Sequence, residues 1–274
     1  MSLKESIKEN NIYNIDCISG MKQIDDNSID MCVTSPPYNV GIKYDKWDDS
    51  MPIDSYFKFA NDWLSELYRI LKPDGRIALN IPYEINAKSS NSGRIFLVSE
   101  YHQIMKNLGY KFAGVVDLTE DQPHRVKLTA WGSWLSPSAP YIYNPKECVV
   151  IAYKDEWVKE VKGKSYFDGS DESKSEFKEL VFAQWKYRAE TRKLTEANFS
   201  LDIPEKSLKI LSYENDIVID PFVGSGTTAI SCINLNRRYI GFEISENYYN
   251  IATNRINKKL SNKLTKEKSL NFWR

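Results

Sequence analysis

Two short stretches of the sequence carry residues whose types and spacing suit chemistry. The first, TSPPYN at positions 34–39, directly follows the apolar run IDMCV. Proline has no backbone N–H, so two successive prolines end strand pairing and leave carbonyl oxygens free in a stiff loop. The loop offers hydrogen-bond acceptors beside an aromatic ring. The candidate catalytic residues are therefore Ser35, Pro36, Pro37 and Tyr38.

The second stretch, DIVIDPFVGSGTT, begins at position 216 and runs from an apolar strand into a glycine loop and the start of a helix. Open α/β sheets bind nucleotide-like cofactors in such a unit, because glycine lets the backbone approach the ligand. Glu243 lies 19 residues beyond Gly224, close to the spacing of about 20 typical of a carboxylate that accepts ribose hydroxyls. The sequence therefore predicts a site for an adenosine-containing cofactor.

The chemistry of this loop favours a cationic ligand over a phosphate. No lysine follows the glycines, and Asp220 would repel a pyrophosphate but bind an ammonium group. S-adenosylmethionine carries an adenosine and an ammonium, and Phe222 could pack near its sulfonium. Asp16, at the end of the first strand, could contact the adenine side or simply form a turn. The predicted cofactor-binding residues are Asp16, Asp220, Phe222, Gly224, Gly226, Thr227 and Glu243.

The elements around both motifs alternate apolar strands with amphipathic helices, the pattern of an α/β fold with a largely parallel sheet. One helix is expected to begin at Asp54 as its N-cap and to end at KPDG, and another to span residues 95–108. Seven strands are expected, at residues 12–15, 29–34, 76–81, 111–118, 148–153, 216–220 and 238–244.

Composition and charge limit the remaining possibilities. Hydrophobic residues make up 42% of the 274 residues, enough for a core, and no apolar run reaches the roughly 18 residues of a membrane span. The four cysteines and two histidines show no metal-ligand or disulfide spacing, so buried cysteines and no metal are expected. Net charge is +0, but the segment 252–274 is basic and could lie on phosphates or form a solvated helix end. We expect a reduced, cytoplasmic protein without a membrane anchor.

Together, TSPPYN and DPFVGSGTT resemble the motifs of the DNA amino-methyltransferases. The catalytic motif precedes the cofactor motif, which is similar to the circularly permuted β class of that family. The resemblance spans nearly the whole chain, including AWGSWLSPSAPYIYNPKECVVIAYK and FSLDIPEKSLKIL. It implies a Rossmann-like S-adenosylmethionine-dependent methyltransferase fold with a seven-stranded, mostly parallel sheet and an inserted target-recognition region. The chain then divides into a catalytic half (1–153), a target-recognition region (154–198) and a cofactor-binding half with the basic C-terminal segment (199–274).

The resemblance implies methyl transfer to the exocyclic amino group of a base flipped out of double-stranded DNA. The lone pair of such a group is delocalised into the ring, so acceptors that orient its hydrogens help the nitrogen to react. Ser35 Oγ and the Pro36 carbonyl are such acceptors, and Tyr38 could stack on the base. No Pro-Cys pair is present to supply a thiolate, so we expect direct transfer without a covalent intermediate.

The target base is less sharply indicated. In the family, serine before Pro-Pro is typical of cytosine-N4 enzymes and aspartate of adenine-N6 enzymes. Ser35 therefore favours cytosine N4, with adenine N6 as the alternative. More remote alternatives are an RNA or protein amide methyltransferase and a DNA-binding module without catalysis.

DNA recognition is expected from QWKYRAETRKL, where aromatic and basic side chains interleave. An amphipathic helix with solvated charges is the alternative there. Trp131 and Trp134 could be core residues or could flank the flipped base. The family further implies a site-specific enzyme, as in restriction-modification systems, acting as a monomer or homodimer with a possible companion endonuclease. The predicted DNA contacts are Trp185, Lys186, Arg188 and Arg192.

Overall fold

A computed structural model of the chain describes residues 7–86, 93–120, 133, 136–140, 142, 144–188, 194–196 and 199–272, the last seven of these without their side chains. Three residues singled out from the sequence, Trp131, Trp134 and Arg192, lie outside this part. No helix in the described part is long and apolar enough to cross a membrane.

One eight-stranded sheet forms the centre of the molecule, with the order β1-β8-β7-β2-β3-β5-β4-β6. The run from β1 to β3 is parallel, β5 is antiparallel to both of its neighbours, and β6 pairs in parallel with β4. All seven expected strands are present. The sequence analysis missed an eighth strand, β6, which lies inside the segment assigned to DNA recognition. The strands are β1 (Asn11–Tyr13), β2 (Ile29–Thr34), β3 (Leu71–Pro82), β4 (Lys111–Glu120), β5 (Glu147–Tyr153), β6 (Gln184–Tyr187), β7 (Ile217–Asp220) and β8 (Arg238–Phe242).

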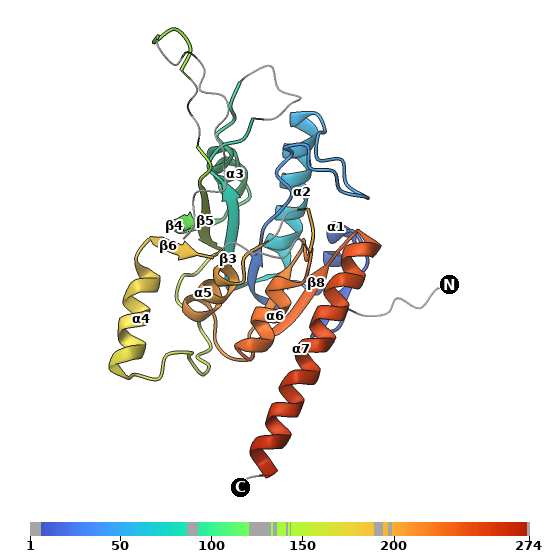
Figure 1. Cartoon of the computed structure of the whole chain (residues 1–274), viewed down its shortest axis with the longest axis vertical. Coiled ribbons are helices and arrows are strands. Elements are labelled where there is room, and N and C mark those ends of the chain that lie inside the picture. The colour runs from blue at the N-terminus through green and yellow to red at the C-terminus, as the bar shows by residue number, and fades with distance from the viewer. Residues whose placement is uncertain are drawn as a thin grey trace.

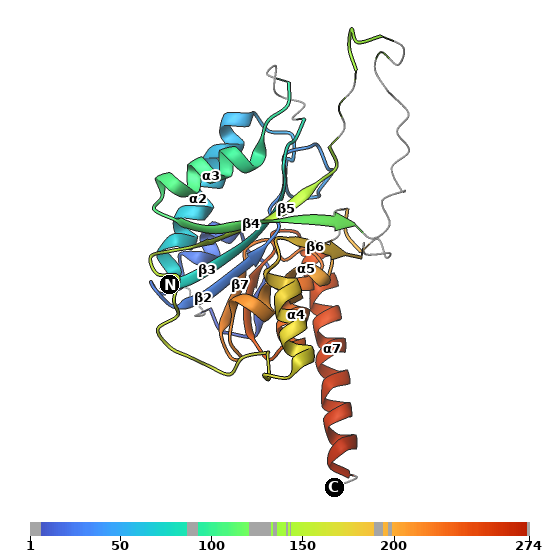
Figure 2. The same cartoon turned by 90° about the vertical axis from the view of Figure 1, so that its left-hand side faces the viewer.

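Helices cover both faces of this sheet (Figure 2). α1, α2 and α3 pack on one face, and α5 and α6 on the other. The strands between them are apolar on both sides: Cys32 of β2 faces the first layer, whereas Met31 and Val33 face the second. α7 continues past the body of the molecule toward the C-terminus (Figure 1). The helices are α1 (Cys17–Met21), α2 (Ile53–Ile70), α3 (Leu97–Asn107), α4 (Asp171–Val181), α5 (Asp202–Leu211), α6 (Thr227–Asn234) and α7 (Glu246–Phe272).

The start of α2 corrects one expectation. The N-cap is Pro52, which makes no side-chain capping bond, and Asp54 lies within the first turn. Its carboxylate there still interacts favourably with the positive end of the helix dipole. The helix ends at Ile70, and the expected stop signal KPDG lies inside β3, which begins at Leu71.

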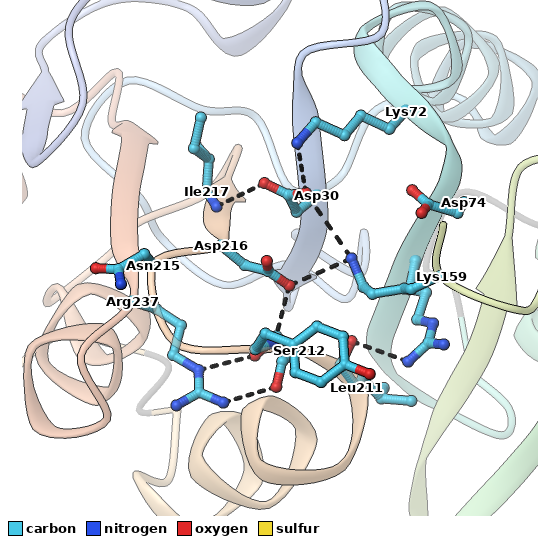
Figure 3. Close-up of polar contacts among 12 residues, drawn as sticks. Asp30, Lys72, Asp74, Lys159, Leu211, Ser212, Asn215, Asp216, Ile217 and Arg237 are labelled. Atoms are coloured by element: carbon cyan, nitrogen blue, oxygen red, sulfur yellow. Dashed lines mark hydrogen bonds and ion pairs between the residues drawn. The ribbon is translucent and has the colours of Figure 1, made fainter. Parts of the chain in front are cut away.

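A buried ion-pair cluster lies at the amino ends of β2 and β7 (Figure 3). Lys159, only 7% exposed, has its Nζ 3.2 Å from Asp216 Oδ2 and 3.8 Å from Asp30 Oδ1. Asp30 also binds Lys72 at 2.6 Å and accepts a hydrogen bond from the Ile217 N–H. Lys159 belongs to the segment 154–198, so the cluster anchors the beginning of that segment at the amino edge of the sheet.

The four cysteines, Cys17, Cys32, Cys148 and Cys232, are buried and unpaired, as expected. Burial raises the pKa of each thiol, which keeps it protonated and unreactive. Within the described residues, no three histidine, cysteine or acidic side chains are grouped as metal ligands.

Candidate active site

The two sequence motifs meet at one cavity of about 460 Å³. β2 and β7 are parallel neighbours, so the loops at their carboxyl ends emerge at the same edge of the sheet. Thr34 Oγ1 donates a hydrogen bond of 2.7 Å to Asp220 Oδ1, across 186 residues of sequence. All four candidate catalytic residues line the cavity together with Phe222, Gly224 and Glu243.

Ser35 and Tyr38 form a hydrogen-bonded pair of hydroxyls at the cavity. Ser35 Oγ lies 2.6 Å from the Tyr38 hydroxyl, which also lies 3.3 Å from the Asn80 main-chain carbonyl. Either hydroxyl can donate across the Ser35–Tyr38 pair, and in both directions Ser35 Oγ keeps at least one lone pair for a ligand. Burial, followed by the nearby charge of Glu147, raises the pKa of Tyr38, so its hydroxyl stays protonated. Ser35 Oγ is thus available as an acceptor.

The two proline carbonyls differ in their partners. The Tyr56 hydroxyl donates to the Pro37 carbonyl at 3.0 Å, whereas no described residue donates to the Pro36 carbonyl. The Pro36 carbonyl is therefore available as a second acceptor beside Ser35 Oγ, as the sequence predicts.

Asp49 holds the chain that follows the catalytic loop, a role the sequence analysis missed. Its carboxylate, 2% exposed, accepts four backbone N–H groups at 2.8–3.0 Å. These donors are consecutive, at residues 39–42, and the first, Asn39, has a left-handed φ of 60°. Further along the same loop, Asp45 Oδ2 accepts a 2.9 Å hydrogen bond from Ser245 Oγ. The loop thereby joins the end of β8 at the cavity rim.

The glycine loop and Glu243 form the other side of the cavity. Gly224 has φ 53°, a conformation that favours glycine, and a Cβ there would meet nothing closer than 4.0 Å. Glu243 accepts the Gly224 N–H at 2.8 Å through Oε2 and the Ser245 N–H at 2.9 Å through Oε1. Each carboxylate oxygen retains a lone pair for a ribose hydroxyl. Burial raises the pKa of Glu243 to about 7.

These features fit S-adenosylmethionine. Open space over Gly224, a carboxylate with spare lone pairs and an aromatic wall at Phe222 match an adenosine joined to a sulfonium. Phe222 is itself held edge-on by Trp63, at 5.3 Å between ring centroids. Asp16 lines the cavity, and its Oδ1 also caps α1 through the Ser19 N–H at 2.9 Å, which is the turn expected there.

Three predicted cofactor contacts, Asp220, Gly226 and Thr227, are not among the residues that line the cavity. Asp220 is 5% exposed, and its Oδ1 accepts the Thr34 hydroxyl and, at 3.0 Å, the Phe222 N–H. It supports the glycine loop from beneath. Gly226 packs against Ala252 of α7, and Thr227 is buried as the first residue of α6.

Comparison with known proteins decides the family. Residues 29–254 match the N6/N4 DNA methylase family. The chain belongs to this family. The methylase is 40% identical to the type II methyltransferase M.MjaVI of Methanocaldococcus jannaschii over 167 residues. This matched stretch covers 61% of the chain and 80% of that relative. It is 27% identical to the type II methyltransferase M.HpaI of Haemophilus parainfluenzae, over 89% of the chain and 73% of that relative.

Solved structures confirm the methyltransferase fold. A protein described as a DNA modification methylase from Thermus thermophilus, complexed with S-adenosyl-L-methionine, superposes with a TM-score of 0.70 at 20% identity, covering 91% of the methylase and 93% of that chain. The cytosine-N4-specific PvuII DNA methyltransferase gives a TM-score of 0.66 at 19% identity, covering 90% and 86%. The methylase is an S-adenosylmethionine-dependent enzyme whose substrate is DNA.

The predicted DNA-contacting stretch divides into an inward and an outward part. Trp185 is 2% exposed, and its indole Nε1 donates to the Leu180 carbonyl at 2.8 Å, so the prediction of a DNA contact there is wrong. The reason is that residues 184–187 form strand β6, whose alternation buries Trp185 and exposes Lys186. Arg188 is also exposed, and Tyr187 lines the cavity.

The basic C-terminal segment is partly used inside the methylase. Arg255 of α7 donates to the carbonyl and to the Oγ of Ser225, which holds the glycine loop. Lys263 donates to the Ile233 carbonyl and to Asn236 Oδ1 at the end of α6. These two side chains make contacts within the fold, which neither of the two alternatives for this segment, phosphate contact or a solvated helix end, included.

Sequence reasoning also missed a polar pair at the cavity, Asn80 and Glu147. Asn80 lies near the end of β3, and Glu147 is the first residue of β5. Both line the cavity, and Asn80 Nδ2 donates to Glu147 Oε2 at 2.6 Å. The available signal was weak: each is a polar residue within or next to a strand that is otherwise apolar, in RIALNI and ECVVIAY.

Proposed function

We propose that the methylase transfers the methyl group to N4 of a cytosine flipped out of double-stranded DNA at a specific sequence. The observation that supports this most directly is the position of Ser35. Its hydroxyl oxygen keeps a lone pair beside the Pro36 carbonyl, in the same cavity as Gly224 and Glu243. The acceptors for an amino group and the candidate adenosine site therefore share one cavity.

In this mechanism, Ser35 Oγ and the Pro36 carbonyl each accept one hydrogen of the target amino group. Held by two acceptors, the amino nitrogen turns its lone pair out of conjugation with the ring and toward the donor. S-adenosylmethionine, when bound, would supply the methyl group and leave as S-adenosylhomocysteine, and the methylated nitrogen would lose one proton. The ring of Tyr38 offers a surface on which the flipped base can stack, while its hydroxyl remains bonded to Ser35 and Asn80.

Ser35 favours cytosine over adenine as the target base, because in the family that this chain resembles the adenine-N6 enzymes carry aspartate at this position. A hydroxyl is a neutral acceptor, and a carboxylate a charged one, for the same two hydrogens. The resemblance to a cytosine-N4-specific structure agrees with this assignment but extends to the fold alone.

We further propose that residues 154–198 recognise the target sequence and that their C-terminal part makes the contacts. Lys159 anchors the beginning of this segment at the amino edge of the sheet, whereas Tyr187, Thr195 and Glu196 line the cavity at the opposite edge. Exposed Lys186 and Arg188, with Arg192, are the proposed DNA contacts. By analogy with type II relatives, the methylase works in a restriction-modification system of the cytoplasm, as a monomer or homodimer with a companion endonuclease.

The test is to incubate the purified methylase with mixed-sequence duplex DNA and S-adenosylmethionine, then identify methylated nucleosides by mass spectrometry. We expect N4-methylcytosine. Ser35→Ala should lower kcat by about 10²-fold with unchanged cofactor binding, whereas Ser99→Ala, on the exposed surface of α3, should match the wild type. N6-methyladenine would overturn the base assignment, and the absence of any methylated nucleoside would overturn DNA amino-methyl transfer by this chain.

A further inference from the structure

Glu147 carries a half-buried carboxyl beside the proposed base site, and the mechanism above does not use it. Asn80 Nδ2 donates a hydrogen bond of 2.6 Å to Glu147 Oε2, and no described residue donates to Glu147 Oε1. Among the ion pairs of the described residues, none includes Glu147, although it lines the cavity. Asn80 Oδ1, which is buried, has no partner either among the described residues. This corner of the cavity therefore offers polar atoms to an occupant that brings polar groups of its own.

Among the described residues, the groups that face Glu147 are neutral. Its charge acts on the hydroxyls of Tyr38, which follows β2, and of Tyr187 on β6, and on the Cys148 thiol next to it on β5. From β3 it meets the Asn80 amide. A carboxylate without a cation is costly in such surroundings, so the neutral acid is favoured. Burial accordingly raises the pKa of Glu147, and the Asn80 hydrogen bond opposes this only in part.

The bases that carry an exocyclic amino group at the reacting position share one further feature. In cytosine the ring nitrogen next to the amino-bearing carbon is N3, in adenine it is N1, and both are hydrogen-bond acceptors. Thymine and guanine have an N–H at the corresponding ring position, next to a carbonyl. A hydrogen-bond donor placed beside the two acceptors of the amino hydrogens therefore matches the ring nitrogen of cytosine or adenine. The same donor would face the ring N–H of thymine or guanine and repel it.

We propose that Glu147 is a base-selecting residue: Asn80 holds one carboxyl oxygen, and the other donates a hydrogen bond to the ring nitrogen beside the target amino group. The proposal rests on amino-methyl transfer as the reaction. Ser35 Oγ and the Pro36 carbonyl then read the amino hydrogens, and Glu147 reads the adjacent acceptor. Thymine and guanine fail at both positions.

The first test compares Glu147→Gln and Glu147→Ala with the wild type, in the full-length methylase acting on duplex DNA across a range of pH. Glutamine keeps an N–H donor that cannot ionise, so we expect Glu147→Gln to retain kcat/KM within a few-fold and to lose the decline of the wild type at alkaline pH. Glu147→Ala should fall at least about 10-fold. Glu172→Gln, on the exposed face of α4, is the matched control. A large loss in Glu147→Gln, or an acid-side decline of the wild type at saturating S-adenosylmethionine that Glu147→Gln removes, would show that the carboxylate is the working form and would overturn the proposal.

The second test places 3-deazacytosine, which lacks the ring acceptor, at the methylated position of the identified site; 1-deazaadenine is used if the methylated base is adenine. Because intrinsic effects of the analogue act on both enzymes, the informative quantity is the ratio between them. We expect the analogue to lower wild-type kcat/KM about 10-fold more than that of Glu147→Ala. An equal loss in both would assign Glu147 a purely structural role. Failure of the wild type on normal DNA would instead refute the proposed function, which keeps the two outcomes distinct.

Discussion

The pKa of Glu243 gives a direct prediction about cofactor binding. The carboxylate form accepts ribose hydroxyls through lone pairs left by the Gly224 and Ser245 N–H groups. The pKa is about 7 in the ligand-free fold, because burial outweighs the two backbone hydrogen bonds. Acidifying the solution through this value therefore removes the binding-competent form. We expect affinity for the cofactor to weaken as the pH falls below about 7.

The size of the effect follows from the fraction ionised. With a pKa of about 7, roughly one molecule in eleven carries the carboxylate at about pH 6, and ten in eleven at about pH 8. Since the apparent Kd scales inversely with the competent fraction, it should fall about 10-fold between these values. The same shift acts on stability with the opposite sign. The folded state holds this proton above the ordinary pKa of 4.5, so the free energy of unfolding decreases by about 3 kcal/mol as the pH rises from about 4.5 to 7.

The assay is isothermal titration calorimetry of the ligand-free methylase with S-adenosylhomocysteine, whose amino group stays charged over this range. Glu243→Gln should bind weakly and independently of pH, while Glu246→Gln, exposed in the first turn of α7, should retain the wild-type slope. Affinity that is flat with pH in the wild type, or an unchanged slope in Glu243→Gln, would refute the assignment of Glu243 as the ribose acceptor.

Two further substitutions test the framework around the site. Lys159→Met leaves Asp216 and Asp30 buried without this partner, so it should lower the free energy of unfolding, measured in urea, by about 3 kcal/mol. Lys164→Met removes an exposed lysine that pairs with Glu214 and should change the free energy of unfolding by less than about 1 kcal/mol. Equal effects of the two substitutions would contradict the buried cluster. Asp49→Ala removes the acceptor of four backbone N–H groups and should lower kcat/KM by at least about 10-fold. The measurement is methyl incorporation, and Asp48→Ala is the neighbouring control. Full activity of Asp49→Ala would show that this loop needs no such support.

The sequence by itself determined the local chemistry. Two prolines after an apolar strand make free carbonyls beside Ser35, and that follows from proline's missing N–H wherever the loop lies. The glycine loop and Glu243 could likewise be predicted from the sequence. A left-handed backbone at glycine and a carboxylate at a strand end are both set by neighbouring residues in the chain. Together with the apolar runs and the resemblance to a known family, these local features were sufficient to predict the cofactor and seven of the eight strands.

The tertiary structure decided which of these groups meet the cavity. Placing β2 beside β7 brings the two motifs together, but the same contact buries Asp220 under Thr34 and removes it from the cavity wall. Antiparallel pairing of β5 with β3 brings Glu147 to Asn80, and the pairing of β6 with β4 turns Trp185 into the core. Strand partners are chosen by burial over the whole chain, so no local pattern in the sequence specifies them.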